Sequence, residues 1–91
     1  MSTTVKFPGS LRRYASGNSE LTVSAPSVRM ALEQLEMRYP ALYRSICDET
    51  GTVRRHINLF VNRSHVRDLN GLDTALVPGD VLIILPAVSG G

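Results

Sequence analysis

The residues with the clearest chemical potential close the chain, which ends in Ser89-Gly90-Gly91. A terminal carboxylate is a poor acyl donor until its oxygen becomes a good leaving group, for instance by adenylation. Glycine lacks Cβ and accepts unusual dihedral angles, so a narrow enzyme channel can hold two glycines in extended form. With glycine usage of about 7%, a terminal pair arises by chance in roughly one chain in 200. The pattern indicates a carboxyl terminus suited to activation, and a frayed end without function is the alternative.

Cys47, His56 and His65 are the other side chains that could act as nucleophiles, bases or ligands. Cys47 stands beside Asp48 and Glu49, and neighbouring carboxylates raise the pKa of a thiol rather than activate it, so we interpret it as a small core residue. The histidines could face each other across a hairpin, but they lack the third ligand and the spacing of a metal site. We expect ordinary surface histidines, no metal and no enzyme activity, because no spacing assembles a catalytic site.

The charge of the chain is mild. Ten Lys and Arg residues against eight Asp and Glu residues give a net charge of +2 over 91 residues, and aromatic residues make up 5%. Nucleic-acid-binding domains concentrate basic charge and often carry aromatic platforms, so we expect no nucleic-acid partner. The basic pairs Arg12-Arg13 and Arg54-Arg55 are interpreted as solvated loops.

The sequence shows no pattern typical of secretion or of a membrane span. One cysteine cannot form an internal disulfide, and the N-terminus lacks the apolar stretch of a signal peptide. No run approaches the roughly 20 apolar residues of a membrane span. We therefore expect a cytoplasmic protein with no membrane contact.

Alternating patterns predict a β-hairpin at the start of the chain. Thr3–Phe7 and Glu20–Ser24 each alternate polar and apolar residues, and Pro8-Gly9 and Ser16-Gly17-Asn18 punctuate the connection.

A helix is predicted next, opened by Pro26 and capped by Ser27. One face carries four core residues, Val28, Leu32, Leu35 and Tyr39, with Ala31 beside them. Pro40 disfavours helical geometry at the residue before it and ends this helix. Residues 41–55 are expected to be irregular, with Leu42 and Ile46 in contact with the core.

Residues 56–85 are predicted to form three strands. We predict a strand over His56–Val61, a tight turn at Asn62-Arg63 and a short strand over Ser64–Arg67. Leu72, Leu76 and Val77 are expected to point inward. Val81–Leu85 is continuously apolar, which is typical of a central strand that is buried on both faces.

Together these elements predict an α+β fold, in which one mixed sheet packs on one main helix. A β-grasp roll meets every one of these constraints. We expect a domain over residues 1–85 and a flexible tail over residues 86–91, because proline cannot donate a ladder hydrogen bond at position 86.

The segment from Gly71 to Gly91 closely resembles the end of prokaryotic ubiquitin-like sulfur carriers of the ThiS/MoaD family. The shared pattern is Gly79-Asp80, an apolar strand, Pro86, the apolar pair Ala87-Val88, a small residue at Ser89, and Gly90-Gly91. The family includes carriers for the thiamine thiazole, the small subunit of molybdopterin synthase and relatives that serve cysteine synthesis. A looser resemblance covers the whole chain.

The resemblance implies a carrier that is monomeric when free and holds no cofactor of its own. An E1-like enzyme, using ATP and magnesium, would adenylate the carboxylate of Gly91. A sulfur-donor enzyme would then supply the sulfur of a thiocarboxylate, and a sulfur-accepting synthase would receive it. The tail residues held in enzyme channels would be Pro86, Ala87, Val88, Ser89 and Gly90. The docking positions that match the family are Pro8, His65 and Leu85.

Several readings of the function stay open. The tail looks closest to carriers for a cysteine-synthase-like enzyme, while molybdopterin, thiazole and specialised-metabolite synthesis remain alternatives. A protein modifier conjugated to lysines shares the same early chemistry. A non-covalent β-grasp binding module with an incidental tail is the third possibility.

Overall fold

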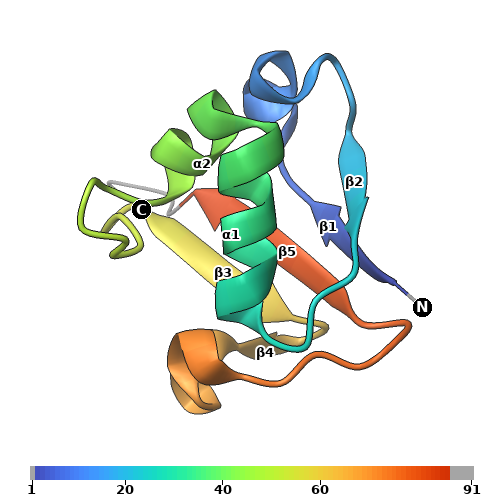
Figure 1. Cartoon of the computed structure of the whole chain (residues 1–91). Helices are drawn as coiled ribbons and strands as arrows, with labels where there is room; N and C mark the ends of the chain where they lie inside the picture. Colours follow the sequence, from blue (N-terminus) through green and yellow to red (C-terminus); the bar gives the residue numbers. More distant parts are fainter. Residues whose placement is uncertain (1, 87–91) are drawn as a thin grey trace.

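The computed structural model describes residues 2–86 of the chain. Five strands form one mixed sheet, which Figure 1 shows. Their order across the sheet is β2-β1-β5-β3-β4. The bounds of the strands are β1 Thr3–Lys6, β2 Glu20–Val23, β3 Ile57–Val61, β4 Ser64–His65 and β5 Val81–Pro86. β1 runs parallel to β5, and the remaining neighbours are antiparallel. The predicted hairpin, the second strand pair and the central position of the last strand are confirmed.

β5 extends one residue further than predicted, through Pro86, which lies opposite Ile57 of β3. Proline removes a hydrogen-bond donor from the ladder, but its fixed φ is compatible with extended backbone. Ala87, Val88, Ser89, Gly90 and Gly91 lie outside the described residues, and so does Met1.

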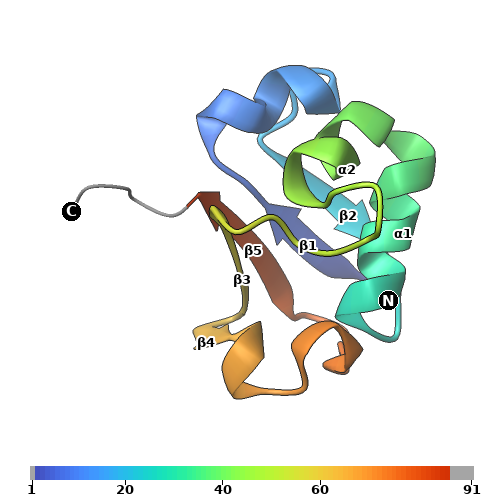
Figure 2. The same cartoon turned by 90° about the vertical axis from the view of Figure 1, so that its left-hand side faces the viewer.

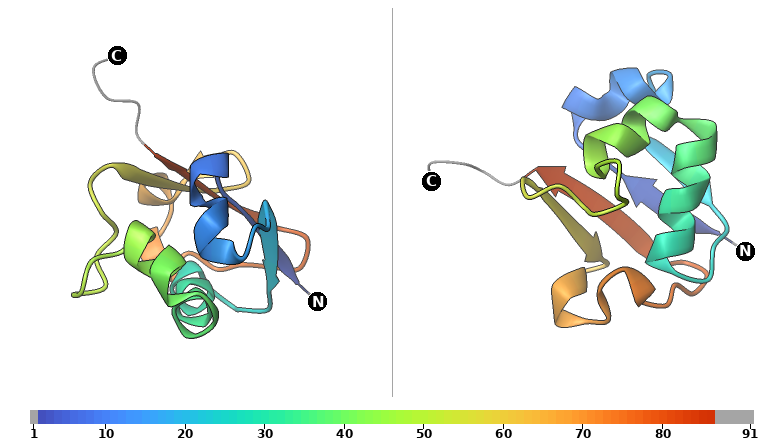
Figure 3. Two further views of the ribbon diagram at one scale, coloured as in Figure 1. Left: turned by 90° about the horizontal axis from the view of Figure 1, so that it is seen from above. Right: turned by 60° about the vertical axis from the view of Figure 1, so that its left-hand side comes forward.

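In the described part of the chain, helices cover one face of the sheet. Leu82 and Ile84 of β5 are completely buried, whereas Val81 and Ile83 are half-buried and Leu85 keeps 42% of its surface exposed. Figures 2 and 3 show both helices on the same side of the sheet. The prediction that the last strand is buried on both faces is therefore wrong, because among residues 2–86 no second layer of helices covers the other side.

α1 (Val28–Arg38) crosses the covered face of the sheet, as predicted. Ser27 is the N-cap of this helix, and its Oγ accepts a hydrogen bond from the Met30 N–H at 3.3 Å. This contact satisfies one of the donors that a helix start leaves free. The residues of α1 that it buries in the core are Val28, Ala31, Leu32 and Leu35.

A second helix, α2 (Pro40–Ile46), occupies a region that was predicted to be irregular. The N–H groups of a first helical turn have no partner within the helix, so a proline there costs no hydrogen bond, and its fixed φ suits a helix. Pro40 therefore ends α1 and begins α2. Leu42 and Ile46 are fully buried in the core, as expected from their apolar character.

Short 3-10 helices form the connections: η1 Gly9–Ala15, η2 Val66–Asp68 and η3 Gly71–Asp73. The predicted fourth strand consequently ends at His65, because η2 begins at the next residue. Leu76 is buried and Leu72 partly so, as predicted. Val77 is 59% exposed, which contradicts its predicted inward orientation, and it lies in the turn before β5.

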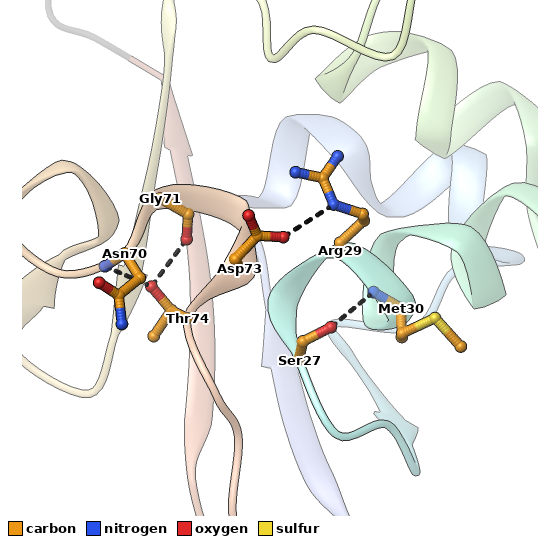
Figure 4. A network of polar contacts seen from close by, with 7 residues as sticks. All are labelled: Ser27, Arg29, Met30, Asn70, Gly71, Asp73 and Thr74. Carbon is orange, nitrogen blue, oxygen red and sulfur yellow. Dashed lines mark hydrogen bonds and ion pairs between the residues drawn. The ribbon is translucent and has the colours of Figure 1, made fainter.

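Polar contacts fasten the connection before β5 to the start of α1 (Figure 4). The Thr74 Oγ1 donates to the Gly71 carbonyl at 2.7 Å, and the Thr74 carbonyl accepts from the Val28 N–H at 3.0 Å. The Arg29 guanidinium also pairs with Asp73 at 3.1 Å. Thr74 is buried, its side chain is bonded within the connection and its carbonyl is bonded to α1. These contacts hold the segment before β5 against the helix. Within residues 2–86, no helix is long and apolar enough to cross a bilayer.

Candidate functional site

The end of β5 fixes the point from which the tail leaves the domain. Pro86 is the last described residue, and it lies opposite Ile57 in the ladder with β3. On its other edge β5 pairs with β1, where Leu82 lies opposite Val5. Pairing on both edges holds β5 firmly up to the point where the segment after Pro86 begins.

Asn62 joins the β3–β4 turn to the start of β5. It adopts a left-handed conformation with φ of 56°, which Asn tolerates better than most residues. Its Oδ1 accepts from the Val81 N–H at 3.0 Å, and its Nδ2 donates to Asp80 Oδ1 at 3.0 Å. The other oxygen of Asp80 accepts from the Val77 N–H at 2.9 Å. The first residue of β5 is thus held by side chains as well as by the sheet.

The uncovered face of the sheet carries an apolar stripe that we call the open-face stripe. Its members are Phe60, His65, Val81, Ile83 and Leu85. Register places Phe60 beside both Ile83 and His65. The rings of Phe60 and His65 meet edge to face, with centroids 5.0 Å apart. Leu85 stands at the end of the stripe next to the tail.

The His65 ring is held in one orientation by two hydrogen bonds. Its Nδ1 accepts from the Arg67 N–H at 3.1 Å, so the ring proton belongs on Nε2. Nε2 lies 3.0 Å from Asn58 Oδ1, an acceptor for that proton, and Asn58 is the register partner of Leu85. Two of the predicted docking residues, His65 and Leu85, therefore share one surface through Asn58.

Pro8, the third predicted docking residue, lies in a separate groove that we call the tail-root groove. This groove holds about 440 Å³ and is formed by η1, α2, the segment before β3 and the end of β5. Its lining residues are Pro8, Ser10, Leu11, Arg13, Tyr14, Ser45, Arg54, His56, Ile57 and Pro86. No sequence pattern predicted this groove, because its walls come from segments far apart in the chain.

The remaining reactive side chains do not form a site. Cys47 is 1% exposed, and burial raises the pKa of its thiol, although a hydrogen bond with Tyr43 acts in the opposite direction. Burial also raises the pKa of Tyr43. His56 faces the tail-root groove and His65 the open-face stripe, so the two do not face each other across the hairpin. Residues 2–86 contain no group of three or more His, Cys, Asp or Glu that could hold a metal ion.

Comparison with known proteins places this geometry in context. Residues 5–91 match the ThiS family. The sulfur carrier protein CysO of Mycobacterium tuberculosis is 34% identical over 93 residues, covering 100% of both chains.

Solved structures agree with the sequence match. In the crystal structure of the BexX/CysO complex of Amycolatopsis orientalis, the matching chain superposes with a TM-score of 0.87 and 32% identity, over 98% of this chain and 99% of that one. The small archaeal modifier protein 1 of Methanosarcina acetivorans gives a TM-score of 0.84 and 38% identity, over 99% of this chain and 96% of that one. These proteins share the β-grasp fold, which confirms the predicted fold class. The chain therefore belongs to the ThiS family of ubiquitin-like sulfur carriers.

Proposed function

We propose that this protein carries sulfur as a thiocarboxylate on Gly91 and delivers it to a biosynthetic enzyme. The observation that carries the proposal is that the central strand ends directly before the Gly-Gly segment. The central strand ends at Pro86, and the five residues that follow it close on Gly90-Gly91 in a chain matched to the ThiS family. The folded domain would serve to present this one reactive group.

The chemistry would run in two activation steps and one transfer. The Gly91 carboxylate attacks the α-phosphate of ATP on an E1-like enzyme, which releases pyrophosphate and gives an acyl adenylate. A sulfide equivalent from a sulfur-donor enzyme then attacks the acyl carbon and displaces AMP. The resulting thiocarboxylate sulfur attacks an electrophile in the acceptor enzyme, and hydrolysis of the acyl–sulfur bond restores the carboxylate. ATP and magnesium belong to the activating enzyme in this scheme.

The reach of the tail limits how a partner can bind. Five residues span at most about 17 Å when fully extended, so an active site that takes Gly91 must come close to Pro86. The open-face stripe lies beside this point, and Leu85 is an exposed apolar residue at its end. We infer that partners dock on this stripe through Leu85 and His65, while Pro8 contributes from the neighbouring groove.

A cysteine-synthase-like enzyme is our favoured acceptor. The CysO relative matches the chain over its full length, and the segment Pro86–Ser89 resembles the tails of carriers that serve such enzymes. Molybdopterin, thiazole and specialised-metabolite synthesis stay as alternatives, because carriers for these pathways have similar tails.

Mass spectrometry tests the proposal. The chain is incubated with its activating enzyme, ATP, magnesium and a sulfur source, and we expect a gain equal to the replacement of one oxygen by sulfur at Gly91. Deletion of Gly91 should abolish the gain, and Gly90→Ala should reduce it. Gly9→Ala is the matched control, because Gly9 has open space around its Cα and no left-handed φ. Sulfur delivery by the Gly91-deleted chain would refute the proposal.

A role as a protein modifier is the second candidate, favoured by the likeness to small archaeal modifier protein 1. The same incubation, carried out with cell extract, would then give adducts in which Gly91 is joined to lysines of other proteins. Lys6 is the only lysine of this chain, so any chain of linked copies would have to grow through Lys6 or the N-terminal amine. Tryptic peptides with a Gly91 isopeptide bond would distinguish conjugation from sulfur delivery.

A further inference from the structure

One arginine from each basic pair of the sequence lines the tail-root groove. Arg13 comes from η1, and Arg54 and His56 come from the segment before β3, yet all three line this one groove. No acidic residue is among its lining residues. The prediction that both pairs are merely solvated loops is therefore incomplete, because the fold gathers one member of each pair around a common hollow.

The two guanidinium groups are positioned by their neighbours. The Arg13 guanidinium lies 5.1 Å from the centre of the Tyr14 ring, a favourable cation–π distance. The Arg54 Nε donates to the Arg44 carbonyl at 2.7 Å. Arg54 also lines a neighbouring hollow together with Glu36, Asp48 and Glu49, so part of its charge is offset on that side and Arg13 is the stronger of the two attractions in the groove. Among residues 2–86 the one ion pair within 4.0 Å joins Arg29 to Asp73, so no described carboxylate neutralises Arg13 or Arg54 by contact.

The groove also has an apolar part, formed by proline, leucine, tyrosine and isoleucine side chains: Pro8, Leu11, Tyr14, Ile57 and Pro86. Cationic groups beside apolar surface complement a peptide that carries both carboxylates and apolar side chains. The mild net charge of +2 and the low aromatic content argue against nucleic acid as the occupant.

The position of the groove connects it with the tail. Pro86 is both a lining residue and the last residue before Ala87. A protein that takes up the tail must therefore cover this surface or lie against it. Arginine suits such a place, because it stays protonated and is a poor acyl acceptor, so it can attract carboxylates without reacting with an activated Gly91. The only lysine, Lys6, lies instead on the open face of the sheet, opposite Ile83.

We propose that the tail-root groove docks an acidic, partly apolar segment of the enzyme that receives the tail, with Arg13 and Arg54 binding its carboxylates. The identity of that enzyme rests on the proposed function, whereas the binding chemistry of the groove does not. The groove thus gives a second contact for partners, distinct from the open-face stripe and selective for charge.

The test titrates the isotope-labelled full chain, with its carboxylate unmodified, with acetyl-Glu-Leu-Asp-Phe-Glu-amide and follows backbone amide shifts by NMR. The control peptide replaces each Glu by Gln and Asp by Asn. We expect saturable shifts at Arg13, Tyr14, His56 and Ile57 with the acidic peptide alone, and weaker binding as salt rises.

Substitutions then assign the charges. Arg13→Glu should weaken binding by about threefold to tenfold, as expected for replacing an exposed attraction by a repulsion. Arg54→Gln should weaken it by a smaller factor. Arg63→Glu is the matched control, since Arg63 is an exposed arginine in the turn at the opposite end of β3.

Three results would overturn the proposal: no saturable shift at about millimolar peptide, equal binding of the neutral peptide, or identical shifts with inorganic phosphate at the same concentration. The titration needs no activated tail, so its failure is distinguishable from a failure of the sulfur-carrier proposal, which the mass measurement decides.

Discussion

Asn62 offers the most direct test of how the domain holds the strand that bears the tail. Its side chain makes two hydrogen bonds to the start of β5, and its backbone sits at φ of 56°. Asn62→Gly removes both side-chain bonds while keeping access to this conformation, and Asn62→Ala removes the bonds and adds backbone strain. Asn62→Asp keeps an acceptor for the Val81 N–H but sets a carboxylate against Asp80.

The magnitudes follow from these contacts. A net hydrogen bond contributes about 0.5–1.5 kcal/mol, and Asn62 is exposed, so the loss of two bonds in Asn62→Gly should cost about 1–2 kcal/mol. A left-handed backbone costs a non-glycine residue at least about 1 kcal/mol, which brings Asn62→Ala to about 2–3 kcal/mol. Both losses are smaller than the about 5–15 kcal/mol stability of ordinary domains, so the variants should still fold.

Urea unfolding followed by circular dichroism measures these differences, provided that the m-value stays constant across the series. We expect the order of stability wild type, then Asn62→Gly, then Asn62→Ala. Equal stability of the Gly and Ala variants would refute the backbone part of the reasoning. A Gly variant as stable as wild type would refute the role of the side-chain bonds. Asn62→Asp should lose stability at neutral pH and regain part of it once Asp80 or the new carboxyl is protonated.

Three further changes test other parts of the domain. Ser27→Ala removes the cap of α1 and should cost about 1 kcal/mol in urea unfolding, whereas Ser27→Asn should retain most of the stability. Ile84→Ala empties a fully buried position and should cost about 2–5 kcal/mol, while Leu85→Ala on the exposed face should cost far less. Hydrogen bonds from the Val77 N–H and from the Asn62 side chain lower the pKa of Asp80. The stabilisation from this carboxylate should therefore be complete above the ordinary aspartate value of about 4 and vanish as pH falls through the lowered value, so Asp80→Asn should flatten the fall of the unfolding free energy below about pH 4.

The elements that local residue types determine were predictable. Ser27 and the apolar spacing that follows it specify α1, and alternation specifies β1 and β2. α2 was missed because proline excludes helix only for the residues before it, and Pro40 begins a helix as readily as it ends one. Cys47 was correctly interpreted as a core residue, since a small apolar side chain next to Ile46 has the core as its nearest environment.

The features that depend on the arrangement of the elements could not be predicted. An apolar run such as Val81–Leu85 does not reveal whether the second face of its strand meets a helix or stays open. The apolar residues on that face are explained by docking, according to our proposal, rather than by the core. Likewise, Arg13 and Arg54 are separated by two helices and a strand in the sequence, and only the path of the chain brings them to one groove.

The central position of β5 has a mechanical consequence. A partner that holds the tail and pulls along the direction of β5 loads this strand through Pro86. β3 pairs with β5 from Leu82 to Pro86 and β1 pairs with it from Val81 to Ile83, so a pull on Pro86 loads the β3 ladder first and then the β1 ladder, both in shear. An edge strand pulled perpendicular to its axis would instead lose its ladder hydrogen bonds one after another. The domain is therefore expected to withstand tension from enzymes that reorient while they hold its tail.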